Sequence, residues 1–197
     1  IEYRLGSVEE QLSKLMPDSS YSVQCITSAQ AVHWFDIPIF YQHVQRILQP
    51  GGVLALWTYG LPTFPNHPKL EETVWHIYED ILGDGYWDPR RKLVENLYRD
   101  IPLIDEFYPE SFSSSSSSSS QRIQGRPELN IQQEVSGAQL QGYVRSWSGY
   151  TKYCQTHQIE SGSDEDPAAR LLTKELDETA TTQCIWPVAM LISVKDK

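Results

Sequence analysis

Two short segments of the sequence combine side chains that can bind or polarise a small molecule. Gln30, His33 and Trp34 follow a segment rich in β-branched residues, and Arg145 lies in a segment rich in aromatic residues. An imidazole can act as a hydrogen-bonding group or as a general acid or base near neutral pH. A guanidinium can pair through two parallel hydrogen bonds with a carboxylate. These residues are therefore the candidates for a ligand site.

Each of them also has a structural interpretation that the sequence leaves open. The ring of His33 can pack against the helix that follows it, and Trp34 can be a core residue. Gln30 can be an ordinary polar residue of a loop. Arg145 can be a solvated arginine on the polar face of a helix.

Composition and charge narrow the class of protein. The chain has 197 residues, 40% of them hydrophobic and 11% aromatic, which suffices for the core of one domain. Its formal net charge of -10 opposes binding to nucleic acid and favours a small-molecule substrate. No apolar stretch approaches the ~18 residues that span a bilayer, and no secretory signal pattern is visible. We expect a cytosolic protein without membrane contact, and the sequence leaves its oligomeric state open.

The three cysteines, Cys25, Cys154 and Cys184, form no closely spaced pair. An odd number of separated cysteines argues against a disulfide framework and against a four-ligand zinc site. We expect three thiols in a reducing compartment and no bound metal.

The first 60 residues alternate between strand and helix patterns. Strands are indicated by alternating or β-branched segments, and helix starts by capping residues at Ser7 and Asp36. The predicted order is a strand at 1–5, a helix from Ser7 to Leu15, a strand at 21–27, a helix from Asp36 to Leu48 and a strand at 53–57. This alternation is typical of an open, mostly parallel α/β sheet.

Beyond residue 60 the pattern changes. Prolines precede apolar residues at helical spacing, so residues 61–112 are predicted to be a helical insertion. The serine run at 113–120 has no apolar surface to bury and is predicted to be disordered. Residues 121–197 are predicted to supply helices and closing strands of the same domain, with a helix from Ser136 to Tyr153, a helix from Asp166 and a strand at 188–194.

Three landmarks follow one another along the chain: Gly6-Ser7-Val8-Glu9, AQAVHWFD at 29–36 and RILQPGGVL at 46–54. In order and spacing they resemble class I S-adenosylmethionine-dependent methyltransferases, whose sheet is Rossmann-like. AQAVHWFD, GYVRSWSGY at 142–150 and WPV at 186–188 resemble the trans-aconitate methyltransferase-like, or type 11, subgroup. The resemblance covers nearly the whole chain apart from the serine run. It implies methyl transfer from S-adenosylmethionine to a small molecule, with a carboxylic acid as the candidate substrate.

The resemblance also implies which residues meet the cofactor. In open α/β sheets, ligands lie outside the carboxyl ends of the strands. The turns after the first two visible strands therefore face one crevice. The resemblance assigns adenine contact to Ser7 and Val8, and contact with the methionine part to Ala29 and Gln30. A helix cap is the alternative role for Ser7.

His33 and Trp34 stand where the family places a cofactor contact, a general base or a wall of the substrate site. His33 is the tentative catalytic residue, although a base is useful only if the acceptor must lose a proton. Tyr143, Arg145 and Trp147 are the candidate substrate-binding residues, because helical spacing places the two aromatic residues on one face with Arg145 near its border.

The chain departs from the family's pattern at its cofactor loop. The glycine-rich loop after the family's first strand, and the acidic residue that binds the ribose hydroxyls, have no counterpart in residues 1–197. Gly83-Asp84-Gly85 cannot replace the loop, because no predicted strand leads into it. We expect that the first two strands are missing and that 1–60 is the carboxyl-terminal part of the cofactor-binding core, with 61–112 on the substrate side. The next strand would then be an unpaired edge.

Other functions have less support in the sequence. A catalytically inactive fragment, or a module that depends on a partner chain, is the main alternative to an active methyltransferase. A nicotinamide-dependent oxidoreductase lacks its dinucleotide fingerprint, and a hydrolase lacks the Gly-x-Ser-x-Gly turn.

The absent loop generates a prediction about affinity. Residues 1–197 alone should bind S-adenosylmethionine at least ~100-fold more weakly than a form extended upstream, a difference of about 2.7 kcal/mol. The reason is that backbone groups of a glycine-rich loop approach the cofactor closely. Titration calorimetry of both forms measures the ratio, and micromolar binding by residues 1–197 alone would contradict it.

Overall fold

The computed structural model describes residues 5–15, 23–114, 117–118, 120–125 and 127–196. The predicted strand at 1–5 lies outside the described residues, apart from Leu5. The chain divides into two compact units. The first consists of residues 1–60, 92–129 and 188–197, and the second of residues 61–91 and 130–187.

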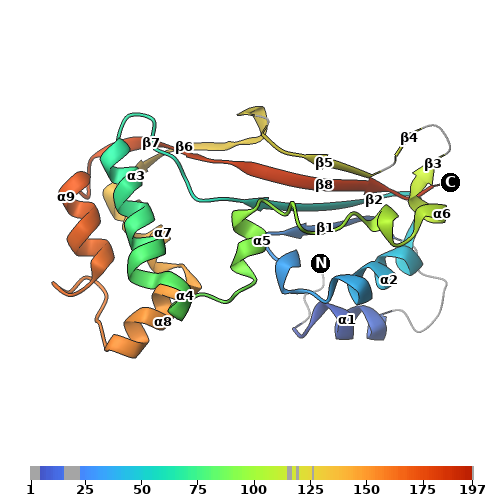
Figure 1. The fold of residues 1–197 in the computed structure, drawn as a ribbon, viewed down its shortest axis with the longest axis horizontal. Coiled ribbons are helices and arrows are strands. Elements are labelled where there is room, and N and C mark those ends of the chain that lie inside the picture. Colours follow the sequence, from blue (N-terminus) through green and yellow to red (C-terminus); the bar gives the residue numbers. More distant parts are fainter. Residues whose placement is uncertain (1–4, 16–22, 115–116, 119, 126, 197) are drawn as a thin grey trace. The chain divides into compact units, whose positions relative to one another are not determined.

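The first unit contains the main sheet and the helices that cover it (Figure 1). Its strands are β1 (Val23–Ala29), β2 (Leu48–Tyr59), β3 (Ser113–Ser114), β4 (Ser117–Ser118), β5 (Ser120–Ile123) and β8 (Val188–Val194). Its helical elements are α1 (Val8–Leu15), η1 (Val32–Trp34), α2 (Ile37–Ile47), α5 (Arg91–Glu95, whose first residue belongs to the second unit), η3 (Ile104–Glu106), α6 (Pro109–Phe112) and η4 (Pro127–Leu129).

The main sheet has the strand order β1-β2-β8-β5 and is mixed. β1 and β2 are parallel, as predicted, because α2 forms a crossover between them. β8 runs antiparallel to both β2 and β5. The expectation of a mostly parallel sheet therefore holds only for β1 and β2 among the described strands. The apolar pattern of 188–194 predicts a strand but carries no information about its direction.

β1 lies at one edge of the main sheet, and no described strand pairs with its other side. Four of its residues are exposed: Gln24, Cys25, Thr27 and Ala29. The core lies further in, where α2 packs on β2 and the buried residues include Phe40, Val44 and Leu54. Whether further strands cover this edge stays a prediction.

The start of α2 shows why the sequence forms a helix there. Asp36 precedes the first turn, and its carboxylate accepts a hydrogen bond from the backbone N–H of Ile39 at 3.2 Å. Pro38 occupies the first turn, where no N–H is needed. Phe40, Val44 and Ile47 then share the buried face. The cap and the helix are confirmed, although β2 begins at Leu48, before the predicted stop at Pro50.

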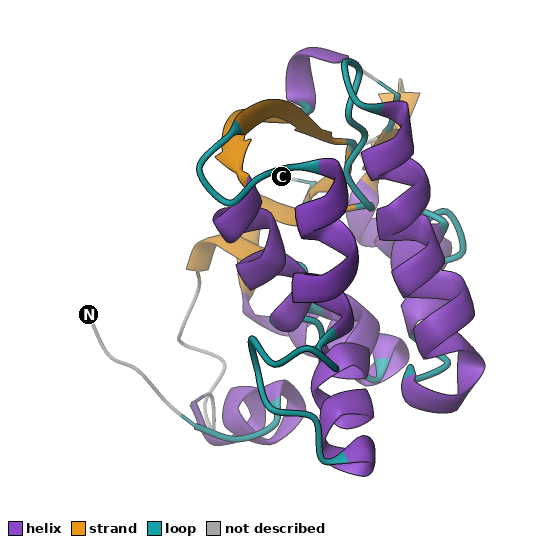
Figure 2. Ribbon diagram, turned by 90° about the vertical axis from the view of Figure 1, so that its left-hand side faces the viewer, coloured by secondary structure: helices purple, strands orange, loops and turns teal. Residues whose placement is uncertain are grey.

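The second unit groups helices with a two-stranded sheet. Figure 2 draws the helices of the chain in purple and its strands in orange. Strands β6 (Ile131–Ser136) and β7 (Thr181–Trp186) pair in antiparallel fashion. The predicted capping box at Ser136 is confirmed, since Ser136 Oγ accepts from the N–H of Gln139 and the Gln139 side chain accepts from the N–H of Ser136. The helical elements are α3 (Pro68–Trp75), η2 (His76–Leu82), α4 (Gly83–Tyr86), α7 (Gly137–Arg145), α8 (Ser148–His157), η5 (Ala168–Leu172) and α9 (Thr173–Glu175).

The helix predicted from Ser136 to Tyr153 is two helices, so that prediction is wrong. α7 ends at Arg145, and α8 begins at Ser148 after an extended Trp147. Gly149, in the first turn of α8, lies so close to the Trp87 ring that an added Cβ would be 2.7 Å from it. The break brings Trp147 and the first turn of α8 against the Trp87 ring, a long-range contact that helical spacing does not reveal.

The serine run contains strand residues where a disordered loop was predicted. β3 and β4 pair with each other, and Ser120 begins β5, which pairs with β8. Residues 115, 116 and 119 lie outside the described residues. Flexibility of the run stays a prediction.

Two expectations about the whole chain concern membranes and thiols. Within the described ranges, no helix is long and apolar enough to cross a membrane. Cys25, Cys154 and Cys184 are all free thiols, and burial raises the pKa of Cys184 to about 12.

The buried Ser120 gives a prediction about stability. Ser120 Oγ donates a hydrogen bond to Ser193 Oγ at 2.9 Å, and both residues are buried. Ser120→Ala should lower the melting temperature by about 2–4 °C, because a buried hydroxyl loses its partner at a cost of about 1 kcal/mol. Replacing both serines by alanine should recover much of this loss. A double variant clearly less stable than Ser120→Ala, measured by thermal unfolding, would contradict the assignment.

Candidate functional site

The carboxyl ends of β1 and β2 are joined by one side chain, that of Gln30. Its Oε1 accepts hydrogen bonds from Thr58 Oγ1 at 2.5 Å and from the N–H of Tyr59 at 3.1 Å. Its Nε2 donates to the carbonyl oxygen of Tyr59 at 3.3 Å, and its own N–H donates to the carbonyl oxygen of Trp57 at 2.8 Å. Gln30 therefore fixes where the two parallel strands end.

Gln30 adopts a backbone conformation that is unusual for its residue type. Its φ is +50°, in the left-handed region, which costs a non-glycine residue about 1–2 kcal/mol. The four hydrogen bonds, each worth about 1 kcal/mol, offset this cost. Strained residues held in this way occur often at ligand sites. Both polar atoms of the Gln30 side chain are engaged with β2, so contact of that side chain with a cofactor stays a prediction.

His33 follows Gln30 in the turn η1 and is only 6% exposed. Its Nδ1 lies 2.9 Å from the hydroxyl of Tyr98, and its ring lies 4.8 Å from the ring of Trp34, measured between centroids. Trp34 is 45% exposed. The interpretation of Trp34 as a core residue is therefore wrong, whereas His33 has the packed surroundings of a structural residue and stands beside an exposed aromatic ring.

Tyr98 is a member of this site that sequence reasoning missed. Tyr98 and its neighbour Leu97 both have left-handed backbones, with φ of +56° and +50°. Arg122 donates to the carbonyl oxygen of Tyr98, and Gln124 donates to that of Leu97 at 2.7 Å. Burial raises the pKa of the Tyr98 phenol to about 12, so it remains protonated and can donate a hydrogen bond. It lies 65 positions from His33, and no local motif indicates the contact.

The other predicted cofactor residues lie at the ends of α1 and β1. Ser7 Oγ accepts a hydrogen bond from the N–H of Glu10 at 3.1 Å, so the alternative role as a helix cap is confirmed. Val8 packs against the core, and Ala29 is exposed at the end of β1. Beside it, the Oγ of Ser28 is buried and has no hydrogen-bond partner among the described residues.

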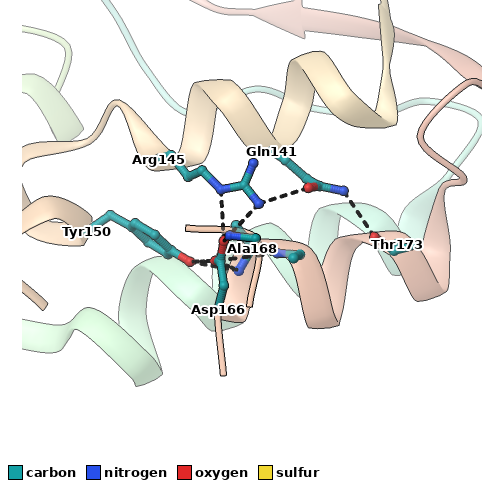
Figure 3. A network of polar contacts seen from close by, with 8 residues as sticks. Gln141, Arg145, Tyr150, Asp166, Ala168 and Thr173 are labelled. Carbon is teal, nitrogen blue, oxygen red and sulfur yellow. Dashed lines mark hydrogen bonds and ion pairs between the residues drawn. The ribbon is translucent and has the colours of Figure 1, made fainter. Parts of the chain in front are cut away.

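In the second unit, Arg145 belongs to a network around the buried carboxylate of Asp166 (Figure 3). Nε of Arg145 donates a hydrogen bond to Oδ2 of Asp166 at 2.9 Å, and Nη2 of Arg145 lies 2.8 Å from the same oxygen. The Asp166 carboxylate also accepts hydrogen bonds from the hydroxyl of Tyr150 and from the N–H groups of Gly162 and Ala168, the last two at 2.7 and 3.0 Å. Arg145 is thus ion-paired with a buried carboxylate, which a merely solvated arginine on the polar face of a helix would not be.

The network continues along α7. Nη2 of Arg145 also donates to Oε1 of Gln141 at 3.0 Å, and Nε2 of Gln141 donates to Oγ1 of Thr173 at 3.0 Å. Figure 3 shows the remaining nitrogen of Arg145, Nη1, pointing away from both Asp166 and Gln141. Arg145 also lines an open cavity of about 420 Å³, together with Tyr150, Cys154 and Gln158.

Tyr143 and Trp147 lie in an aromatic cluster of the same unit. Trp147 is 8% exposed, and its ring contacts those of Tyr78 and Trp87 at 5.4 and 6.0 Å between centroids. Tyr143 contacts Trp147 edge to face. The structure brings these two residues together but directs Arg145 to Asp166. Whether the three contact a substrate stays a prediction.

No group of three or more His, Cys, Asp or Glu side chains that could hold a metal ion occurs in the described part of the chain. The polar groups at the ends of β1 and β2 are hydroxyls, amides and one imidazole. Such groups suit hydrogen bonding to a polar organic ligand beside the exposed indole of Trp34.

Comparisons with known proteins identify relatives of the chain. No protein-family model matches it. A Dictyostelium discoideum protein named as a methyltransferase is 33% identical over 197 residues, which are all of this chain and 67% of that protein. A Saccharomyces cerevisiae protein named as an S-adenosylmethionine-dependent methyltransferase is 28% identical over 156 residues, or 74% of this chain. The match spans about half of the yeast protein, 52%.

One solved structure also resembles the chain closely enough to support this relationship. A type II methyltransferase from Anaeromyxobacter dehalogenans matches with a TM-score of 0.66 and 26% identity, over 93% of this chain and 68% of that one. The mixed sheet and its helices therefore have the architecture of a methyltransferase.

The Asp166 network predicts a dependence of stability on pH. Burial raises the pKa of Asp166, but hydrogen bonds from Tyr150, Gly162 and Arg145 outweigh it, so the pKa lies below its ordinary value. The stabilisation is complete above the unfolded-state pKa of about 3.9 and is lost as pH falls through the folded-state pKa. Asp166→Asn should cost about 3 kcal/mol at pH 7, or roughly 6–12 °C in melting temperature.

Thermal unfolding between pH 7 and pH 3 checks this, and the gap between wild type and variant should narrow below about pH 4. Asp164→Asn is the matched control, because Asp164 is exposed on the same loop. A gap that stays constant with pH would contradict a role for the ionised carboxylate.

Proposed function

The chain belongs to the S-adenosylmethionine-dependent methyltransferases, and on this premise we propose that its protein transfers a methyl group to a small molecule. The proposed substrate class is a carboxylic acid, as in the trans-aconitate methyltransferase-like subgroup. The single observation that carries the proposal is the Gln30 junction, because it fixes the carboxyl ends of two parallel strands, where open α/β sheets bind ligands.

The cofactor site is proposed to include Ser7, Val8, Ala29, Gln30, His33 and Trp34. Two observations support a fit to S-adenosylmethionine. The exposed indole of Trp34 offers an apolar surface, and the buried Oγ of Ser28 lacks a partner among the described residues. Bound there, the cofactor would supply an electrophilic methyl group. The contribution of the chain would be to hold that group and the acceptor in line.

Positioning is the main chemical task of such a site. Methyl transfer from a sulfonium is an in-line displacement, and correct placement of two reactants can lower a barrier by several kcal/mol. A carboxylate acceptor is already deprotonated at neutral pH. A rigid junction at Gln30 and a fixed His33 suit a reaction that needs orientation more than proton transfer.

Arg145 is proposed to contribute to substrate binding from the second unit. Its Nε and Nη2 are held by Asp166 and Gln141, which restricts the orientation of the guanidinium. Nη1 points away from both partners, and Arg145 lines the cavity of about 420 Å³. A carboxylate would find a preoriented donor there. Tyr143 and Trp147 would support α7 through the aromatic cluster.

Trp34 provides the sharpest test of the cofactor site. Trp34→Ala should weaken binding of S-adenosylmethionine by the protein about tenfold, the effect of losing roughly 1.4 kcal/mol of aromatic contact. Trp75→Ala is the matched control, since Trp75 is 43% exposed but lies in the second unit. Equilibrium dialysis with labelled cofactor measures both affinities. Equal affinities for wild type and Trp34→Ala would show that the cofactor binds elsewhere.

A further inference from the structure

The turn that follows α5 has a backbone conformation that its residue types disfavour. The N–H of Leu97 donates to the carbonyl oxygen of Val94, and the N–H of Tyr98 donates to that of Leu93, both at 2.8 Å. This pattern ends a helix with a left-handed residue, which is usually glycine. Here Leu97 takes that position and Tyr98 continues in the same region, with φ of +50° and +56°. Two such residues in succession need contacts from outside the turn to hold them.

Two side chains from β5 and the residue after it supply those contacts. Arg122 donates from Nη1 to the carbonyl oxygen of Tyr98 and from Nη2 to that of Ile101, the second at 2.7 Å. Gln124 donates from Nε2 to the carbonyl oxygen of Leu97 at 2.7 Å. A guanidinium is planar and its donors are fixed relative to one another. Arg122 therefore holds two carbonyl groups of the turn in one relative orientation.

β5 is itself fixed to the main sheet. It pairs with β8, where Arg122 lies opposite Leu191, and Ser120 Oγ donates to Ser193 Oγ at 2.9 Å. Ser120 and Arg122 are two positions apart, so their side chains leave the strand on the same side. Because Ser120 is buried, that side faces the interior. An arginine directed there needs hydrogen-bond partners, and the carbonyl groups of the turn provide them.

The side chain of Tyr98 reaches the candidate cofactor site. Its hydroxyl lies 2.9 Å from Nδ1 of His33, and the two rings are 6.0 Å apart between centroids. Tyr98 and His33 are both buried, and η1 also carries the exposed Trp34. The backbone of Tyr98 is thus held from β5 while its side chain contacts η1.

We propose that Arg122 and Gln124 are positioning residues of the candidate cofactor site. They hold Leu97 and Tyr98 in the left-handed conformation, and the phenol of Tyr98 in turn keeps His33 and the turn η1 in place. The contact serves this purpose whichever of the two groups donates the hydrogen. The effect on cofactor binding rests on the proposed function, whereas the effect on the contact between Tyr98 and His33 does not.

The contact between the two rings can be observed in this protein by nuclear Overhauser effects, with ¹³C-labelled histidine and tyrosine. The signals are assigned by their loss in His33→Gln and in Tyr98→Phe. Arg122→Met should lose most of the effect between the two rings, because the turn relaxes when its carbonyl groups lose the guanidinium. Full retention of the effect in Arg122→Met overturns the proposal.

Arg46→Met is the matched control, because Arg46 carries the same charge but is exposed on α2. It should retain the effect, and an equal loss in this variant also overturns the proposal. Thermal unfolding shows whether each variant is folded at the temperature of the measurement. If Arg122→Met does not fold, Gln124→Ala decides, since it removes the bond to the carbonyl of Leu97 and leaves Arg122 in place. It should weaken the effect, and an unchanged effect overturns the proposal.

Titration with S-adenosylmethionine tests the consequence for the cofactor site. Arg122→Met should weaken binding about tenfold, which corresponds to about 1.4 kcal/mol, and Arg46→Met should not. Unchanged affinity in Arg122→Met, together with weaker binding by Trp34→Ala, overturns the positioning role while the proposed function stands. Unchanged affinity in both Arg122→Met and Trp34→Ala contradicts the proposed function instead.

Discussion

The carboxyl ends of β1 and β2 depend on one set of hydrogen bonds, those between the Gln30 amide and the end of β2. Gln30 turns the chain out of β1 with a left-handed backbone, and its contacts with Thr58 and Tyr59 make that turn stable. The turn η1, with His33 and Trp34, starts two residues later. Without the junction, β1 would have no fixed end, and the groups that follow it would lose their common orientation.

Both units hold a candidate site residue in place through a buried polar group. In the first unit the group is the neutral phenol of Tyr98, and the side chain that it orients is His33. In the second unit the group is the carboxylate of Asp166, and the side chain is Arg145. The difference matters, because an ion pair responds to pH in the acid range whereas a phenol with a pKa of about 12 does not.

Local patterns in the sequence predicted the elements whose causes are local. The cap at Asp36, the capping box at Ser136 and the apolar strand Val188–Val194 depend on neighbouring residues, and all three are confirmed. The antiparallel direction of β8 and the strand β6, whose residues are mostly exposed, depend on pairing partners far along the chain. The roles of Tyr98 and Asp166 were missed for the same reason. Single candidates such as His33 and Arg145 could be named, but their partners could not.

The central claim is that the ends of β1 and β2 around Gln30 form the cofactor site. A crystal structure of the protein bound to S-adenosylhomocysteine tests it most directly. We predict that the amino-acid part of that ligand contacts the segment from Ala29 to Trp34. A ligand bound away from this segment, with Gln30 and His33 unchanged and untouched, would contradict it.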